Sequence, residues 1–454
     1  MNKLLIVAAL SCAAPLAHAQ TWIRLVGDTP GQSTSLATTQ ALATGEDGVV
    51  HVQTTSVTAT GQTFGHLYAF GRDGGPLSWL TTTAVRPGGG SLLARGVSAL
   101  EGHRVSWYDS RATSGGAISP NLVLYTSGQS TPDLNLGVGG SGTTLALFAS
   151  DGVDGVFAVY DDPSLGSKPR VASFGRPNFI RWSRMVGGCP SNDFLPVKVL
   201  AADYEPGPIP RLSVVTRCEA APAQGGGQIS IVGVDPLNGT VVSRSNTWPY
   251  PDSDAPVVAA QAIGAGRFVI EQADSQSGDR TVRVADINGA EEPLPMPPDF
   301  RPGAAVRFPG GALIPAIDVV RKNIGGLRIE SDRMSWFEYG ELNTLARQDL
   351  VWGASASGMA AVAYREPVES DERRPVQLRV LTEDGRVVSR RRIDTYPTQS
   401  DGRVELLALP RNDAALVLAV DVTLPDGRGS VYLEQFPLQS DSGELPIGIA
   451  AGPR

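Results

Sequence analysis

The sequence predicts an all-β protein, for three reasons. The chain is rich in turn residues, with 52 Gly and 34 Pro, and long helical patterns are missing. Residues 228–248 (QISIVGVDPLNGTVVSRSNTW) have the pattern of a strand, a tight turn and a second strand. Weaker copies of this hairpin recur roughly every 50 residues along the chain. Together these observations predict a β-propeller of four-stranded blades.

The clearest hairpin shows how the pattern works. Ile229 and Ile231 fall on one face of its first strand, and Val232 and Val234 fall on the other. An Asp-Pro-Leu-Asn-Gly turn follows, and Thr-Val-Val begins the return strand. We predict similar outer hairpins at residues 66–82, 121–136, 169–184, 280–295, 326–339 and 377–393, and a partial copy from residue 430.

A second, more apolar pair of strands with its own turn precedes each outer hairpin. Examples are residues 145–160, 256–272, 350–364 and 404–422. Each unit is therefore four short strands in about 50 residues. An inner pair that is more apolar than the outer pair is typical of a propeller blade, whose inner strands are packed on both faces.

Eight such units predict eight blades. The eighth unit lacks a good fourth strand, whereas residues 21–26 (TWIRLV) read as a stray outermost strand. We predict that this N-terminal strand completes the last blade, which leaves no open edge between the first and last blades. Seven blades are the alternative, if residues 300–345 are an insertion. Two sandwich domains would need a linker, and the sequence shows no low-complexity break. Only residues 341–349 have a faintly helical pattern.

Residues 1–19 have the pattern of a secretory signal peptide. Lys3 gives the positive start, residues 4–10 the apolar segment, and Ala17-His18-Ala19 the cleavage site. We therefore expect a bacterial protein exported to the periplasm or secreted, with residues 20–454 as a single propeller domain. A lipoprotein signal with acylated Cys12 is the alternative. No later run of about 18 apolar residues predicts a transmembrane segment.

Two cysteines follow the signal peptide, Cys189 and Cys218. An even pair in an oxidising compartment predicts a disulfide. It would close a loop of about 30 residues and stabilise the fold by about 3–4 kcal/mol. In a propeller, the link between the second and third strands shares a face with the link to the next blade. Cys218 ends a second strand and Cys189 lies in the link before the same blade, so both are expected on one face. Two buried free thiols are the alternative.

One hairpin carries a more specific pattern. In residues 70–79 a strand ending at Asp73 leads through a glycine turn to a strand with Trp79. Two other hairpins keep the Asp-Gly turn but carry Ser243 and Ser389 where tryptophan would stand. This pattern resembles the quinoprotein-type propeller repeat. The resemblance implies a superfamily that includes calcium-binding dehydrogenases carrying pyrroloquinoline quinone and also non-catalytic scaffolds. Those dehydrogenases pair two adjacent cysteines, which this chain lacks. We therefore expect a non-catalytic member without a cofactor.

Three histidines remain after the signal peptide, His51, His66 and His103. All three fall in the first two predicted blades, so we expect structural or surface roles for them and no zinc site. Acidic loops at residues 151–155 and 286–289 only faintly resemble calcium loops, and turn chemistry explains them as it explains the repeated aspartates. We assign no catalytic, cofactor-binding or metal-binding residue. Four tryptophans in or near outer strands are expected to pack between blades: Trp79, Trp182, Trp248 and Trp336.

Charge and loop length indicate the kind of partner. The net charge is −8 without a basic stripe, which argues against nucleic acid. The long loops 108–120, 218–227 and 364–375 fall on one predicted face, and long loops on a rigid scaffold often carry function. The sequence therefore predicts an exported, non-enzymatic scaffold that binds a protein through this loop-rich face. The alternative is an enzyme of the lyase or hydrolase type, or a carbohydrate or peptide binder, with its site in the central channel.

Overall fold

The computed structural model describes residues 22–26, 34–44, 49–58, 63–84, 96–100, 104–112, 118–126, 134–137, 144–150, 155–162, 168–175, 179–186, 197–205, 208–218, 228–245, 248–249, 257–273, 280–288, 291–293, 300–302, 305–308, 311–318, 323–330, 333–341, 351–354, 359–365, 376–382, 387–393, 404–408, 415–423 and 429–437. Every regular element in these residues is a β-strand. The all-β prediction is confirmed. The faintly helical residues 342–349 lie outside the described residues.

The described strands pair antiparallel into eight sheets of four or five strands. The first four sheets contain β2 (Thr34–Thr44), β3 (Val50–Thr58), β4 (Thr63–Phe70) and β5 (Pro76–Ala84); β6 (Gly96–Leu100), β7 (Arg104–Ala112), β8 (Ile118–Thr126) and β9 (Leu134–Gly137); β10 (Thr144–Ser150), β11 (Gly155–Asp162), β12 (Lys168–Gly175) and β13 (Phe179–Met185); and β14 (Val197–Glu205), β15 (Arg211–Cys218), β16 (Gln228–Val234), β17 (Val241–Arg244) and β18 (Trp248–Pro249).

The other four sheets continue the same order along the chain. They contain β19 (Val257–Gly264), β20 (Arg267–Ala273), β21 (Arg280–Asp286) and β22 (Glu291–Pro293); β23 (Phe300–Pro302), β24 (Val306–Phe308), β25 (Gly311–Asp318), β26 (Asn323–Glu330) and β27 (Met334–Glu341); β28 (Val351–Ala354), β29 (Met359–Arg365), β30 (Val376–Thr382) and β31 (Val387–Ile393); and β32 (Val404–Ala408), β33 (Ala415–Thr423) and β34 (Gly429–Pro437) with β1 (Trp22–Val26).

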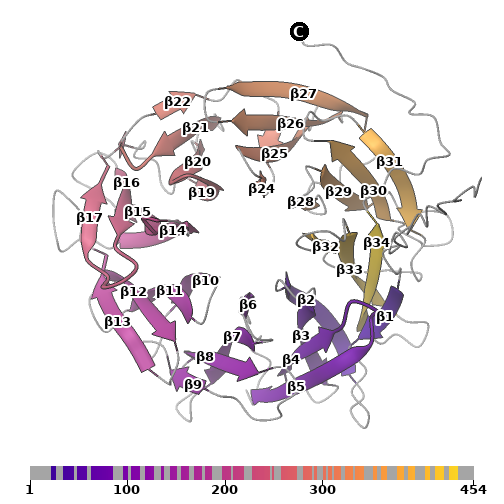
Figure 1. Cartoon of the computed structure of the whole chain (residues 1–454). Coiled ribbons are helices and arrows are strands. Elements are labelled where there is room, and N and C mark those ends of the chain that lie inside the picture. Colours follow the sequence, from indigo (N-terminus) through magenta and orange to yellow (C-terminus); the bar gives the residue numbers. More distant parts are fainter. Residues whose placement is uncertain are drawn as a thin grey trace, which may run out of the picture.

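The sheets stand side by side around a central opening. Figure 1 shows β6, β10 and β24 next to this opening, and β5, β13 and β27 at the periphery. Each predicted outer hairpin is found as the third and fourth strands of a sheet, and each predicted inner pair precedes it. In the range 300–341, the strands β23 to β27 form a sheet of their own. This arrangement is that of a β-propeller.

The sheet of β14–β18 shows why these residues form strands. β16 lies between two neighbouring sheets, so both of its faces are buried and β-branched residues alternate on it. Ile229 and Ile231 pack with residues of β20 and β21 in one cluster. Val232 and Val234 pack with residues of β11 and β12 in another. The two faces predicted from the sequence are therefore confirmed.

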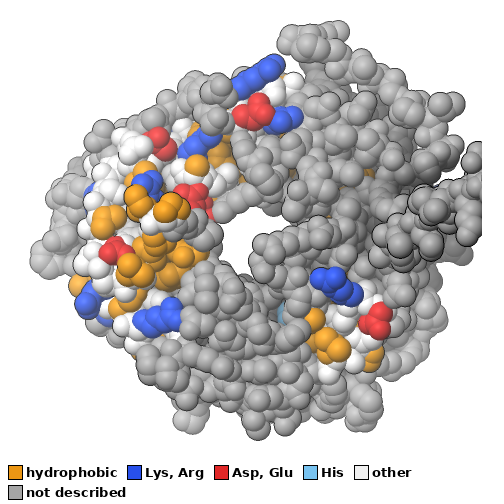
Figure 2. All heavy atoms as spheres, viewed as in Figure 1, with side chains coloured by type: hydrophobic (Ala, Val, Ile, Leu, Met, Phe, Trp, Pro, Cys, Tyr) orange, Lys and Arg blue, Asp and Glu red, His pale blue; other side chains and the backbone are white. Residues whose placement is uncertain are grey.

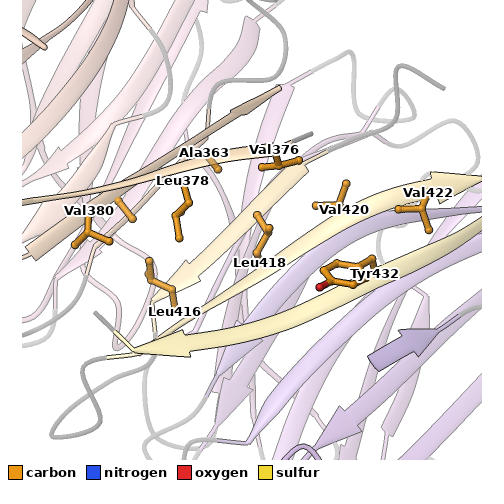
Figure 3. Close-up of a cluster of buried hydrophobic side chains, with 10 residues drawn as sticks. Ala363, Val376, Leu378, Val380, Leu416, Leu418, Val420, Val422 and Tyr432 are labelled. Carbon is orange, nitrogen blue, oxygen red and sulfur yellow. The ribbon is translucent and has the colours of Figure 1, made fainter. Parts of the chain in front are cut away.

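Neighbouring sheets are held together by apolar clusters. Figure 3 shows one of them, in which Leu416 and Leu418 of β33 face Leu378 and Val380 of β30. Burial of one such side chain contributes about 1.5–3 kcal/mol, so a cluster of this size outweighs any single polar contact between sheets.

The first and last sheets in the chain also contact each other. Val50 and Phe70 of the first sheet share a buried cluster with Val417 and Leu433 of the last. β1 pairs with β34 at the outer edge of the last sheet, with Arg24 opposite Leu433. The N-terminal strand therefore lies in the sheet formed by the C-terminal strands.

Candidate interaction surface

The described histidines are part of the core. His51 on β3 is buried, and His66 on β4 is 0% exposed. The ring of His66 lies against that of Tyr68, with 6.0 Å between the ring centroids. Burial lowers the pKa of His66 from 6.5 to about 4, because the charged imidazolium would lose its hydration. His66 is therefore a neutral packing residue at neutral pH. His103 lies outside the described residues.

The carboxylates at the repeated turn position stabilise the turns. Asp73 Oδ1 accepts a hydrogen bond of 2.9 Å from the backbone N–H of Gly75. Asp286 Oδ1 accepts one of 2.8 Å from the N–H of Asn288. These contacts confirm the turn role predicted for both aspartates. Within the described strands and turns, no group of three or more His, Cys, Asp or Glu residues could hold a metal ion. The acidic loop at 151–154 lies outside them.

Only one cysteine of the predicted disulfide is described. Cys218 is the last residue of β15; it is buried and packs against Val197, the first residue of β14. Cys189 lies outside the described residues, so the disulfide remains a prediction. The same holds for most of the loop-rich face, because residues 113–117, 219–227 and 366–375 also lie outside.

The turn between β16 and β17 is tightly bonded to itself. Asp235 Oδ1 accepts a hydrogen bond of 2.8 Å from the N–H of Leu237. Asp235 Oδ2 accepts one of 2.7 Å from Asn238 Nδ2. Asn238 Oδ1 in turn accepts one of 2.8 Å from the N–H of Thr240. The side chains of the Asp-Pro-Leu-Asn-Gly sequence therefore fix the shape of the turn.

This turn is also fastened to β13 of the preceding sheet. Trp182 Nε1 donates a buried hydrogen bond of 2.9 Å to the carbonyl oxygen of Pro236. Gly239 has a φ of +76° and lies directly on Trp182, since an added Cβ would come within 2.4 Å of Trp182 Cε3. Arg244 Nη2 donates one of 3.2 Å to the carbonyl oxygen of Val186. The hairpin and β13 thus form one rigid unit.

The predicted packing role of the tryptophans is confirmed at two positions. Trp182 is buried in a cluster between two sheets. Trp336 packs against the cluster shared by β20 and β26. The side chains of Trp79 and Trp248 lie outside the described part of the structure.

Large apolar side chains are nevertheless exposed on this unit. Leu237 at the turn is 79% exposed, and Val241 and Val242 on β17 are 42% and 62% exposed. β17 is the edge strand of its sheet. The guanidinium-bearing side chains of Arg184 and Arg244 are exposed beside it. We call Leu237, Val241, Val242, Arg184 and Arg244 the β17 edge surface.

Sequence reasoning missed this surface. The available signal was the pair Val241-Val242, which breaks the alternation expected of an outermost strand. Figure 2 shows that hydrophobic side chains also gather over β14 and β15, beside the central opening. Among the residues whose exposure is described, Ile209, Leu237, Val241 and Val242 expose large apolar side chains on the sheet of β14–β18, and exposed apolar surface can mark a binding site.

Comparison with known proteins identifies no family for this chain. No protein-family model matches the sequence, and no curated protein matches it. The chain is similar to a solved eukaryotic initiation factor, with 10% identity and a TM-score of 0.50, over 91% of this chain and 87% of that one. It is also similar to the β-propeller domain of the Trilobed protease from Pyrococcus furiosus, with 8% identity and a TM-score of 0.45 over 91% and 99% of the two chains. A third similar structure is the WD40 domain of SCAP from fission yeast, with 9% identity and a TM-score of 0.46 over 91% and 98%. The eight sheets of described strands around a central opening are what place the chain among β-propellers. The described part of the chain contains no helix that could cross a membrane.

Proposed function

We propose that the chain is an exported, eight-bladed β-propeller, closed by its N-terminal strand, that acts as a non-enzymatic scaffold for a protein partner in the periplasm or outside the cell. The pairing of β1 with β34 supports the closure. The apolar cluster shared by the first and last sheets supports it as well. The degenerate Asp-Gly-Trp pattern supports the further proposal that the chain is related to the non-catalytic quinoprotein-like propellers.

One observation supports the non-enzymatic part of the proposal: two described residues with acid–base chemistry, His66 and Asp235, are used by the fold. A general base must reach its substrate and have a pKa near the working pH. His66 has no exposed surface and its pKa is lowered to about 4. Asp235 has both carboxylate oxygens bonded within its own turn. These groups stabilise the propeller, and a stable propeller presents its loops rigidly.

The partner is proposed to bind the loop-rich face. Of its three predicted loops, residues 364–375 (YREPVESDERRP) carry the most charge, with both signs, although residues 364–365 belong to β29. Charges on an exposed loop accelerate and orient association with a complementary protein. The loop joins β29 to β30, so it follows the second strand of its sheet, as the loop at 218–227 also does.

The test exchanges residues 366–374 for a glycine–serine linker of equal length in the affinity-tagged full-length protein. Partners are then recovered from the periplasm and the medium and identified by mass spectrometry. Residues 383–386, in the hairpin turn that follows β30, are exchanged in the same way as the control. We expect the first exchange alone to abolish recovery of a specific partner. Equal recovery with both variants would contradict the proposal.

Export has its own measurement. Cell fractionation combined with N-terminal sequencing should give a mature chain that begins at Gln20. A chain retained in the cytoplasm with Met1 in place would contradict export. A lipid-modified Cys12 at the mature N-terminus would instead show that cleavage occurs before Cys12 and not after Ala19.

A further inference from the structure

We propose a second binding site, separate from the loop-rich face: the β17 edge surface binds an extended peptide segment with alternating apolar and acidic side chains, which adds to the sheet as a further strand beside β17. The proposal rests on the backbone at the edge, on the exposed apolar side chains and on the local charge.

The backbone of β17 is oriented for strand addition. The N–H of Ser245 donates to the carbonyl oxygen of Ile231 at 2.8 Å, and the N–H of Ile231 donates to Ser245 Oγ at 2.8 Å, so these two residues are bonded to each other. Bonded and non-bonded pairs alternate in an antiparallel ladder, and Arg244 opposite Val232 is therefore a non-bonded pair. The N–H and C=O groups of Arg244 thus point away from β16. An added strand is recognised through such outward-directed groups.

The side chains at this edge supply apolar contacts. Val242 is the extra residue of a register shift between β16 and β17, and it is 62% exposed. Val241 precedes it, and Leu237 lies at the tip of the turn. An extended segment beside β17 would cover these side chains with every second residue of its own. Burial of apolar area adds free energy of binding to the backbone hydrogen bonds.

Charge selects an acidic partner over a second copy of the chain. Arg184 and Arg244 are exposed at the edge, on a protein whose net charge is −8. The carboxylate of Asp235 is bonded within the turn by Leu237 and Asn238. Pairing of two copies edge to edge would bring the arginines of both copies together, and these like charges repel each other. Acidic side chains of a different partner would instead be attracted.

The surface is held in place before the peptide arrives. The hydrogen bonds from Trp182 to Pro236 and from Arg244 to Val186 fasten the hairpin to β13. Little conformational entropy is therefore lost on the protein side when a segment binds.

The test measures peptide binding by fluorescence anisotropy with the full-length protein. The probe is a fluorescein-labelled decapeptide of alternating valine and glutamate. Two comparison peptides have lysine in place of glutamate, or N-methylated backbone nitrogens at every second residue. We expect the glutamate peptide to bind at least about tenfold more tightly than either, because the first comparison reverses the charge and the second removes backbone donors.

Protein variants locate the site. Val242→Asp should weaken binding of the glutamate peptide at least about tenfold, since it replaces an apolar contact by a repulsive charge. Leu77→Asp is the matched control, because Leu77 is 51% exposed on β5, the edge strand of the first sheet. It should leave binding unchanged, and both variants are checked for an unaltered circular dichroism spectrum.

Three results would overturn the proposal. They are the absence of measurable binding of the glutamate peptide, equal weakening by Val242→Asp and Leu77→Asp, and equal binding of the N-methylated peptide. The proposal would also be overturned, in favour of self-association, if light scattering detected a homodimer of the wild-type protein and Val242→Asp dissociated it. None of these results bears on the loop exchange at 366–374, so the two proposals fail independently.

Discussion

Replacement of Gly239 by alanine tests how tightly neighbouring sheets are packed. Gly239 has a φ of +76°, a conformation that costs an L-residue about 1–2 kcal/mol. Its added Cβ would also come within 2.4 Å of Trp182 Cε3 and 2.7 Å of Arg184 Cγ. Trp182 is buried, so its ring cannot move into solvent without loss of packing. We expect Gly239→Ala to lower the free energy of unfolding by more than the backbone strain alone.

The size of this effect follows from the contacts. Displacement of Trp182 breaks its hydrogen bond to Pro236, which is worth about 0.5–1.5 kcal/mol. Added to the backbone strain, this gives a loss of about 1.5–3.5 kcal/mol. Gly266→Ala is the matched control, because Gly266 has a φ of +64° but its Cβ would meet nothing closer than 3.6 Å. That variant should lose about 1–2 kcal/mol, from backbone strain alone.

The two free energies are measured by urea denaturation followed by circular dichroism. Only the difference between the two variants reports the contact with Trp182, because the backbone strain is common to both. Equal losses for Gly239→Ala and Gly266→Ala would refute the argument that this turn is packed against the preceding sheet.

Three further predictions concern a histidine, the two cysteines and a tyrosine. The pKa of His66 is lowered to about 4 in the folded protein, against 6.5 in the unfolded chain. Because the unfolded state binds the proton more strongly, the free energy of unfolding should fall by about 3 kcal/mol as the pH drops from 6.5 to 4. His66→Phe should flatten that pH dependence in urea titrations, and an unchanged slope would contradict the neutral, buried state. Conversion of Cys189 and Cys218 to serine should lower the unfolding free energy by about 3–4 kcal/mol under oxidising conditions. Reaction of both wild-type cysteines with maleimide before any reduction would show that the disulfide is absent. Tyr432 donates a buried hydrogen bond of 2.5 Å to Glu434 Oε2. Tyr432→Phe should therefore lower the free energy of unfolding in urea titrations by about 1–3 kcal/mol. An unchanged free energy of unfolding would show that the Glu434 carboxylate does not depend on this hydroxyl.

The parts of the fold that were predictable are local. The hairpin of β16 and β17 follows from alternating β-branched residues and an Asp-Gly turn, and both features act within a few residues of the chain. The repetition of that pattern predicts the propeller, because one four-stranded unit cannot bury both of its faces alone. The pairing of residues 22–26 with the last sheet was also predictable, from a missing strand at one end of the sequence and a surplus strand at the other.

The candidate surface was not predictable in the same way. Exposure of Val242 depends on a register shift between β16 and β17, and the pair Val241-Val242 does not by itself show where that shift falls. Packing of Trp182 on the Pro236 carbonyl joins positions in two different sheets. The burial of His66 likewise depends on neighbouring elements, since a histidine at the start of an outer strand could equally face solvent.

By itself, the sequence of this protein determines which segments become strands, which of their faces are apolar and where the chain turns, because these properties arise from neighbours along the backbone. The tertiary structure alone decides which apolar residues remain exposed at an edge and which ionisable groups lose their water. Those outcomes depend on how closely one sheet approaches the next, and residues far apart in the chain set that distance.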